Sequence, residues 1–156
     1  MPSSRSCKRR PVLAYVRHNC CCCPNIYTMP TSRSYALPKG ERLHSLSAVR
    51  RLFADGESGF VFPFRYMVYR ENSTSPSVEV LFSVPKRNHK RANRRNLIRR
   101  RSKEAYRLHK SVLHTYAEAE SIDLDIAFVY SAKEILPYNT IEHAINKIMA
   151  EVACRP

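Results

Sequence analysis

The chain has 156 residues, enough for one domain with a tail, and a hydrophobic fraction of 44% that permits a modest core. Its 27 Lys and Arg residues against 13 Asp and Glu residues give a formal net charge of +14, which indicates a polyanionic partner. No apolar run approaches the roughly 20 residues of a membrane-spanning helix, and three glycines are too few for the Gly-rich phosphate loops of common nucleotide-dependent enzymes.

Residues 1–30 form a basic, cysteine-rich segment at the amino terminus. This segment does not make a targeting signal, because its apolar stretch at residues 12–16 is short and is followed by Arg17 and His18. We expect a disordered tail, or a translation start placed too early with Met29 as the true start. One folded domain is expected over residues 31–156.

The six cysteines are four consecutive ones at positions 20–23, together with Cys7 and Cys154. Adjacent cysteines do not converge easily on one tetrahedral metal ion, whose ligands are normally spaced along the chain. A disulfide framework would need more cysteines in the rest of the chain. The pattern therefore favours reduced thiols in a cytoplasmic protein that has no metal site of its own.

The first predicted element is a short helix at about residues 46–55, after a basic lead-in that contains Arg42. Ser47 is placed to cap this helix and Gly56 to end it. One face of the helix carries Val49, Leu52 and Phe53.

Two or three strands are predicted next, and two of them are placed by their sequence patterns. Pro63 places the start of the first near residue 64. Its alternating residues share one face, namely Phe64, Tyr66, Val68 and Arg70. An Asn-, Ser- and Pro-rich stretch at residues 71–77 predicts a hairpin loop, and residues 78–84 alternate as the second strand.

The second half of the chain is predicted to contain a long helix at about 90–114, a linker at 115–121, a strand at 124–130 and a final helix at 139–152. The strand is almost continuously apolar, as expected of a strand covered on both faces. Asn139 and Glu142 have capping-box spacing. The buried stripe of the final helix is Ile141, Ile145, Ile148 and Val152. This order predicts an α/β (α+β) two-layer sandwich, one mainly four-stranded sheet with about three helices.

Between residues 86 and 110 the chain has twelve Lys and Arg residues and one acid, Glu104. On a helix with about 100° per residue, the apolar side chains gather on one side, namely Leu97, Ile98, Ala105, Leu108 and Val112. Another side gathers Arg95, Asn96, Arg99, Arg100, Lys103, Arg107 and Lys110. The helix is therefore expected to pack one face on the core and to present the other to an anion.

Like charges at i,i+4 repel on a helix by a few tenths of a kcal/mol per pair. A merely solvated face is therefore the weaker interpretation of this charge run, since a bound polyanion removes the repulsion. Guanidinium groups also bind phosphate with two bonds. DNA is the weaker choice of polyanion, because the sequence after Lys110 lacks the apolar heptads of a basic leucine zipper and zinc-finger spacing is absent.

The stretch "FSVPKRNHKRANRRNLIRRRSKEAYRL", residues 82–108, resembles the signature of the bacterial ribonuclease P protein subunit. Three further stretches resemble the first helix, the aromatic strand and the last strand of that family, "GERLHSLSAVRRLF", "FRYMVYR" and "LDIAFVYSAK". The resemblance covers about residues 39–152. It implies a ribosomal-protein-like fold with a left-handed crossover.

The resemblance further implies a subunit that pairs with the catalytic RNA of ribonuclease P, which uses Mg2+ to remove the 5′ leader from precursor tRNA. The protein would carry no catalytic residue; it would hold the RNA in its active form and bind the single-stranded leader. Arg95, Asn96, Arg99 and Arg100 match the family's R-N-x-x-[KR]-R positions. With neighbouring cations, the expected RNA-binding set is Lys86, Arg87, Lys90, Arg91, Arg94, Arg95, Asn96, Arg99, Arg100 and Lys103.

The family's leader site is a cleft between the first helix and the sheet, and its positions fall here on Val49, Phe53, Tyr66 and Tyr69. Aromatic side chains stack on unpaired bases, which Val49 cannot do. For Phe53, core packing and a place in the cleft are both open.

The family usually has Arg at the position of Leu97 and an apolar residue at that of Arg101. These two positions are one helical turn apart. We hypothesise a compensated exchange, in which Leu97 packs on the sheet and Arg101 reaches outward from an apolar surface.

Two other functions fit parts of the pattern. A ribosomal protein with no catalytic partner would share the charge and the fold, although the basic helix and the aromatic strand favour a subunit of a ribonucleoprotein enzyme. A stand-alone nuclease would need a metal site, and Asp123 and Asp125 share one strand face. A solvated strand entry near the positive patch is the stronger interpretation of that pair, and no His or Glu completes a metal site.

Overall fold

The computed structural model describes residues 36–154; our expectations for residues 1–30 fall outside this range. The elements in chain order are η1 (Lys39–Glu41), α1 (Leu46–Asp55), β1 (Glu57–Val61), β2 (Phe64–Asn72), β3 (Val78–Ser83), α2 (Ala92–His109), α3 (Ser111–Glu120), β4 (Ile122–Tyr130) and α4 (Tyr138–Cys154). The first and last predicted helices and all three predicted strands are confirmed to within two residues at each end.

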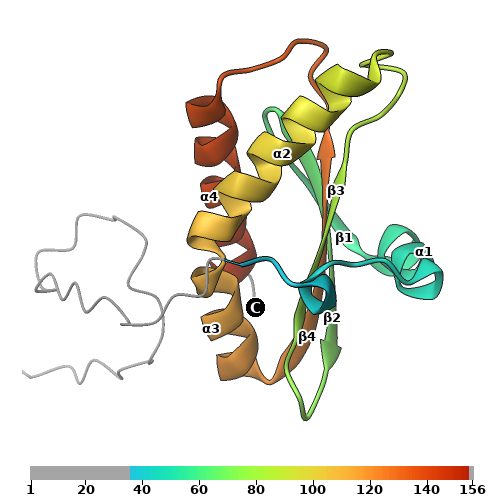
Figure 1. Ribbon diagram of the computed structural model, residues 1–156. Helices are drawn as coiled ribbons and strands as arrows, with labels where there is room; N and C mark the ends of the chain where they lie inside the picture. Colours follow the sequence, from blue (N-terminus) through green and yellow to red (C-terminus); the bar gives the residue numbers. More distant parts are fainter. Residues whose placement is uncertain (1–35, 155–156) are drawn as a thin grey trace, which may run out of the picture.

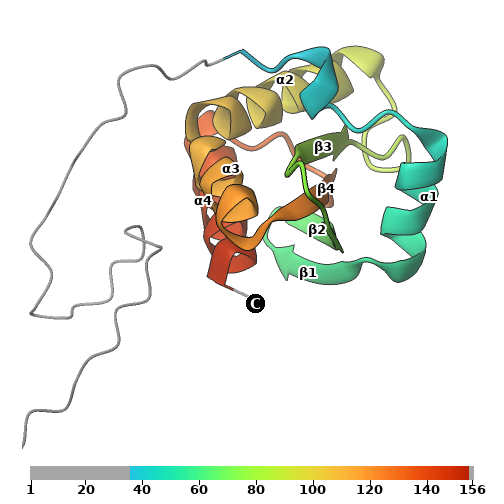
Figure 2. The ribbon, with the colours of Figure 1, turned by 90° about the horizontal axis from the view of Figure 1, so that it is seen from below.

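The four strands form one mixed sheet in the order β1-β2-β4-β3. β2 pairs antiparallel with both β1 and β4, whereas β3 and β4 are parallel. The central strand β4 is buried from Leu124 to Phe128, which accounts for its almost continuously apolar sequence. The connection from β3 to β4 runs through α2 and α3, and the two views in Figures 1 and 2 show that this crossover is left-handed, as the resemblance implied.

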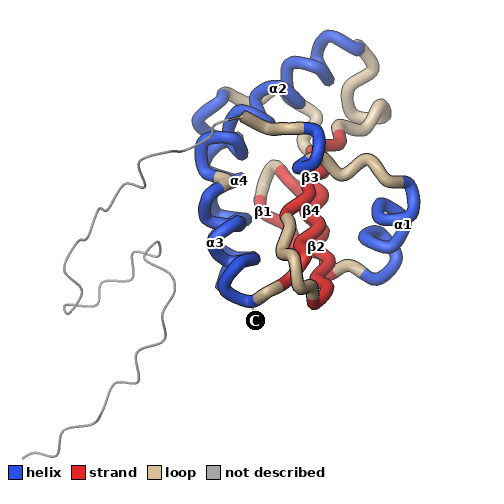
Figure 3. Tube along the Cα trace, turned by 60° about the horizontal axis from the view of Figure 1, so that its bottom comes forward, coloured by secondary structure: helices blue, strands red, loops and turns tan. Residues whose placement is uncertain are grey.

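Helices lie on both faces of the sheet. Figures 1 and 3 show α2, α3 and α4 over one face and α1 alone against the other. The main core lies under the three helices and includes Phe64, Tyr106 and Phe128, each at most 1% exposed. A smaller cluster lies under α1, where Leu52 packs with Ala127. Below, the side of the sheet that carries α1 is called the α1 face.

The sequence left a third strand before the long helix open and did not place β1. Its first residues, Glu-Ser-Gly, have a weak preference for strands, so only the segment from Phe64 onward was expected to be extended. β1 forms because every one of its residues pairs with a residue of β2 across a tight turn. Gly59 is required in this hairpin, because a Cβ atom there would lie 2.3 Å from Cζ of Tyr66.

The single long helix predicted at 90–114 is in fact two helices, α2 and α3, which meet at Lys110. The predicted linker at 115–121 is helical through Glu120, because its Ala and Glu residues favour helix and the inner side of α3 is buried against the core. α3 ends at Glu120, and the residue that follows it, Ser121, has a left-handed φ of 55°. No helix within residues 36–154 is long and apolar enough to cross a membrane.

Two predicted helix caps are wrong. Ser45 is the residue before α1, so Ser47 lies inside the helix, where its Oγ is 2.8 Å from that of Ser45. Asn139 likewise lies inside α4, and Glu142 bonds to Nε2 of His109 at 3.0 Å instead of capping the helix. The predicted stripe of α4 is confirmed, with at most 1% exposure for Ile141, Ile145, Ile148 and Val152.

Candidate nucleic-acid interface

The loop between β3 and α2 is fastened to the loop that follows β4. Nδ2 of Asn88 donates to the backbone oxygen of Ser131 at 2.9 Å, and Nε2 of His89 lies 3.0 Å from that of Ala132. His89 is 3% exposed and is therefore an anchor for the loop. The cations of this loop are all exposed, namely Lys86, Arg87, Lys90 and Arg91.

Arg95 belongs to the predicted RNA-binding set, but its guanidinium group already has partners inside the protein. Nη1 donates to the backbone oxygens of His89 and Lys90 at 2.9 and 2.7 Å. These bonds close the turn into α2, whose N-terminus has no side-chain cap. Arg95 thus orients the cationic loop, while its helix neighbours Arg94 and Asn96 are exposed.

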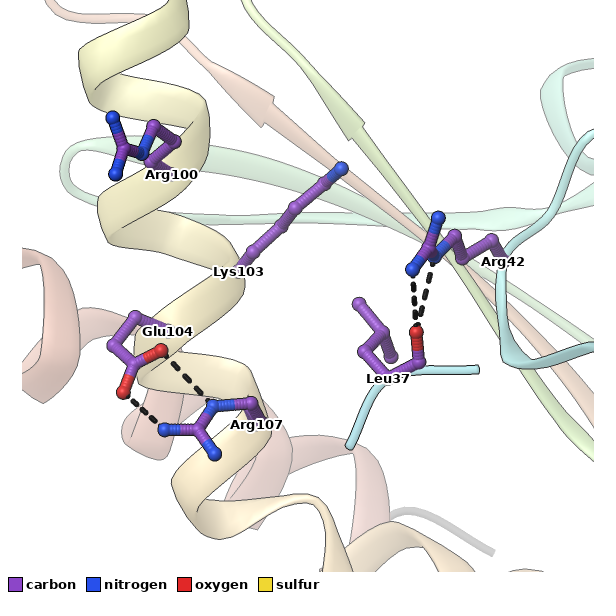
Figure 4. Close-up of a pocket in the computed structure, with 6 residues that line it drawn as sticks. All are labelled: Leu37, Arg42, Arg100, Lys103, Glu104 and Arg107. Carbon is purple, nitrogen blue, oxygen red and sulfur yellow. Dashed lines mark hydrogen bonds and ion pairs between the residues drawn. The ribbon is translucent and has the colours of Figure 1, made fainter. Parts of the chain in front are cut away.

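A groove of about 290 Å³ lies between α2 and the segment that precedes α1 (Figure 4). Its lining residues are Leu37, Arg42, Arg100, Lys103, Glu104 and Arg107. Arg42 donates from Nε and Nη2 to the backbone oxygen of Leu37 at 3.2 and 2.6 Å, which holds this side chain at the groove wall. Lys103 extends from α2 toward Arg42 in Figure 4.

The cations around this groove act on one another. The pKa of Lys103 is lowered from its ordinary value, first by partial burial and then by the charges of Arg42 and Arg99. Arg99 also has a buried Nε for which the described part of the chain supplies no hydrogen-bond partner. A phosphate group in the groove would offset this repulsion, and the guanidinium of Arg100 would be able to bind it with two bonds.

Two cations of the expected basic face have protein partners instead. Nε of Arg107 donates to Glu104 at 3.0 Å. Nζ of Lys110 lies 2.7 and 2.9 Å from the two carboxylate oxygens of Glu41 and 2.7 Å from the backbone oxygen of Ala36. Lys110 therefore fastens the amino-terminal segment to the helices. Sequence reasoning left Arg42 unassigned, because helical periodicity cannot link a residue outside the helix to its charged face.

The hypothesis of a compensated exchange between Leu97 and Arg101 is wrong. Leu97 is 41% exposed, so it does not pack on the sheet. Nη1 of Arg101 donates to the backbone oxygen of Leu136 at 2.7 Å and so ties α2 to the loop before α4. Core contact in this part of α2 comes from Ile98 and Tyr106, both fully buried.

The structure separates the two tyrosines that were predicted for the leader cleft. Successive side chains of a strand point to opposite faces, and Tyr66 lies on the face away from α1, 2% exposed in the main core. Its hydroxyl donates to Glu151 of α4 at 2.7 Å. The prediction that Tyr66 lines the cleft is therefore wrong.

The other three predicted residues of the cleft lie at the α1 face. Tyr69 packs with the small cluster, but the guanidinium carbon of Arg51 lies 4.7 Å from the centroid of its ring. Val49 is half-buried against the same cluster. Phe53 is 44% exposed, so core packing does not account for it and it is available to a ligand.

The carboxylates of Asp123 and Asp125 also have partners. Oδ1 of Asp123 accepts bonds from the backbone nitrogen and Oγ of Ser77, both at 2.8 Å. Asp125 is 8% exposed, 3.7 Å from Arg51, and its pKa is raised, first by burial and then by Glu79. A solvated strand entry does not describe this pair. Among residues 36–154, no three His, Cys, Asp or Glu residues are placed to hold a metal ion.

A mixed sheet with a left-handed crossover and a groove lined by cations defines this chain as a small α+β protein suited to bind a polyanion. A family model described as Ribonuclease P matches residues 37–153. The chain is 32% identical over 127 residues to the ribonuclease P protein component of Porphyromonas gingivalis, covering 80% of this chain and 92% of that protein. The chain therefore belongs to the ribonuclease P protein component family.

Further similarities agree with this assignment. The ribonuclease P protein component of Chlorobaculum tepidum is 38% identical over 110 residues, covering 65% of this chain and 71% of that protein. The structure of the Staphylococcus aureus protein has a TM-score of 0.55 at 20% identity, covering 73% of this chain and 96% of that one. The Thermotoga maritima protein has a TM-score of 0.56 at 19% identity, covering 71% and 96%. The two solved structures share the fold.

Proposed function

We propose that this chain is the non-catalytic protein subunit of ribonuclease P and binds the catalytic RNA of that enzyme through α2 and the loop before it. The RNA, with Mg2+ ions that it holds, performs the hydrolysis that releases the 5′ leader of precursor tRNA. The protein stabilises the active form of the RNA and binds the single-stranded leader at the α1 face.

The observation that carries this proposal is the groove between α2 and the amino-terminal segment. Arg42, Arg100 and Lys103 converge there from two segments of the chain, and burial and the neighbouring charges lower the pKa of Lys103. Folding gains nothing from gathered like charges, whereas an RNA backbone supplies the missing anions. In the loop that precedes α2, Lys86 and Arg87 are also exposed and open to an RNA backbone.

Two features support a division of labour between protein and RNA. The carboxylates of Asp123 and Asp125 are engaged by Ser77 and Arg51, so they do not offer an open metal site. The cations would bind RNA phosphates whatever the base sequence, because phosphate contacts position an RNA but do not read its bases. The protein thus contributes binding and positioning, and the chemistry belongs to the RNA.

The test is reconstitution with a bacterial ribonuclease P RNA, precursor tRNA and magnesium. The protein alone should be inactive, and the complex should cleave precursor tRNA at low salt concentrations at which the RNA alone cleaves it only weakly. The double variant Arg99→Ala/Arg100→Ala should bind the catalytic RNA more weakly, with a salt slope lower by about 1–2 units. Lys147→Ala, at an exposed cation of α4, serves as the matched control.

Two outcomes would contradict the proposal. Robust cleavage by the RNA-free protein would make it a nuclease in its own right. An unchanged salt slope in the double variant, with folding intact by circular dichroism, would remove α2 from the RNA interface.

A further inference from the structure

A row of four side chains crosses the α1 face at the end of the sheet that lies nearer the cationic loop. Phe60 of β1 pairs with Arg65 of β2, Arg65 pairs with Val129 of β4, and Val129 pairs with Ser83 of β3. The neighbours of Arg65 in β2, Phe64 and Tyr66, are buried in the main core. Alternation therefore places the whole row on the opposite face, which α1 shares.

Helix α1 covers the next row of the sheet but leaves this one open. Met67, Ala127 and Leu81 form that next row and belong to the small cluster packed with Leu52. In the open row, Phe60 is 62% exposed and Arg65 is also exposed.

The expected aromatic residues of the cleft are less accessible than Phe60. Tyr66 is 2% exposed, and the ring of Tyr69 is covered by the guanidinium of Arg51. Val49 has no ring. Of the aromatic side chains that the described strands place on the α1 face, Phe60 is therefore the one whose ring is open to stacking.

Charge distinguishes the two ends of the α1 face. At the end away from the open row, Glu79 pairs with Asp125 and Glu71 pairs with Asp123, and Arg51 is the cation that contacts this acidic group. A polyanion is repelled there. At the other end Arg65 lies in the open row, and Lys86 and Arg87 follow Ser83 of that row closely along the chain.

We propose that Phe60 and Arg65 form a subsite for one unpaired nucleotide of the tRNA leader. The base stacks on the ring of Phe60, and Arg65 binds the adjoining phosphate. Stacking on an aromatic side chain tolerates any base, which suits a leader of variable sequence. The acidic end of the α1 face keeps the leader on the half of the sheet that leads to the cationic loop. This inference rests on the proposed function and extends it to residues outside the sequence-predicted set.

The experiment uses the reconstituted complex and two precursor tRNAs, one with a long single-stranded leader and one with the leader cut to a single nucleotide. Phe60→Leu removes the ring and keeps an apolar side chain. It should weaken binding of the long-leader precursor by about fivefold or more, the lower bound for one stacked base. Binding of the short-leader precursor should be unchanged. Phe60→Tyr should retain full discrimination between the two precursors.

Phe62→Leu is the matched control, because Phe62 is 59% exposed but lies in the turn after β1. Phe62→Leu should change the affinity for the long-leader precursor and for the short-leader precursor by no more than about twofold. Arg65→Gln should weaken binding of the long-leader precursor and lower the salt dependence of that binding.

The possible failures are distinguishable. If the wild-type complex binds both precursors equally, leader binding is absent and that part of the proposed function falls. If the wild type discriminates and Phe60→Leu discriminates equally well, the subsite is wrong while leader binding stands. Equal losses with both precursors would place Phe60 against the catalytic RNA or the tRNA body and would overturn the inference. If Phe60→Leu proves unstable, Phe60→Tyr decides, since loss of discrimination in that folded variant would also contradict stacking.

Discussion

Lys103 and Lys110 belong to the same basic segment, yet the structure gives them opposite roles. Nζ of Lys110 makes three bonds, two to Glu41 and one to Ala36, and the side chains of the pair are 12% and 19% exposed. Lys110→Met keeps the length of the side chain and removes the cation. It should therefore lower stability and leave RNA binding almost unchanged.

The magnitude follows from partial burial. Removing one partner of a fully buried ion pair costs about 3–5 kcal/mol, and a hydrogen bond to a charged group contributes about 1.5–3 kcal/mol. Here water reaches both groups, and His114 still lies 3.8 Å from Glu41. We expect a loss of about 2 kcal/mol in the free energy of unfolding, or a fall of roughly 8 °C in Tm for a domain of this size.

Lys103→Met should do the reverse. Partial burial, Arg42 and Arg99 lower the pKa of Lys103, so its charge is unfavourable in the folded protein. Removing that charge should leave stability unchanged or raise it slightly. Affinity for the catalytic RNA should fall, and the salt slope should drop by about one unit.

Urea unfolding and RNA binding at several salt concentrations test both variants. A double-mutant cycle of Lys110→Met with Glu41→Gln should give a coupling energy of about 1 kcal/mol or more. The opposite roles of the two lysines are refuted if Lys110→Met leaves the urea midpoint unchanged and lowers the salt slope as much as Lys103→Met does. The two cations would then share one role.

Three further predictions concern the fold. Gly59→Ala should cost about 2 kcal/mol, because the new Cβ would lie 2.3 Å from Cζ of Tyr66, whereas Gly40→Ala, with nothing within 4 Å, should leave the urea midpoint unchanged. Burial is the first cause that lowers the pKa of His114 below its ordinary value of 6.5, so at mildly acidic pH the unfolded chain binds more protons than the folded one and stability falls as pH drops. His114→Gln should make the stability of the fold depend less on pH in this acidic range, as urea unfolding at several pH values would show. An equally steep dependence in the variant would contradict the role given to His114. Burial and then Glu79 raise the pKa of Asp125, so its charge is unfavourable in the folded protein at neutral pH. Asp125→Asn should therefore stabilise the fold at neutral pH, and the gain should shrink as the pH falls to values at which an ordinary carboxyl group is protonated. Urea unfolding at several pH values tests this.

The sequence by itself determined the elements with strong periodicity. The apolar stripe of α4 and the alternation in β3 each correspond to one buried surface, whereas the apolar run of β4 corresponds to burial on both faces, and the structure has all three. The basic segment was identified in the same way, with Ile98 and Ala105 correctly placed inside. Periodicity succeeds here because burial of a helix side or a strand face depends on residues that are near one another in the chain.

Only the tertiary structure decided which cations are free and which aromatic rings are accessible. Lys110 is bound by Glu41, 69 residues earlier in the chain, and Tyr66 by Glu151, 85 residues later. Alternation shows that Tyr66 and Tyr69 point to opposite faces, but it does not show that three helices cover one face and α1 only part of the other. A charge or a ring acquires its role from neighbours that folding brings from distant segments, and those neighbours leave no periodic trace in the sequence.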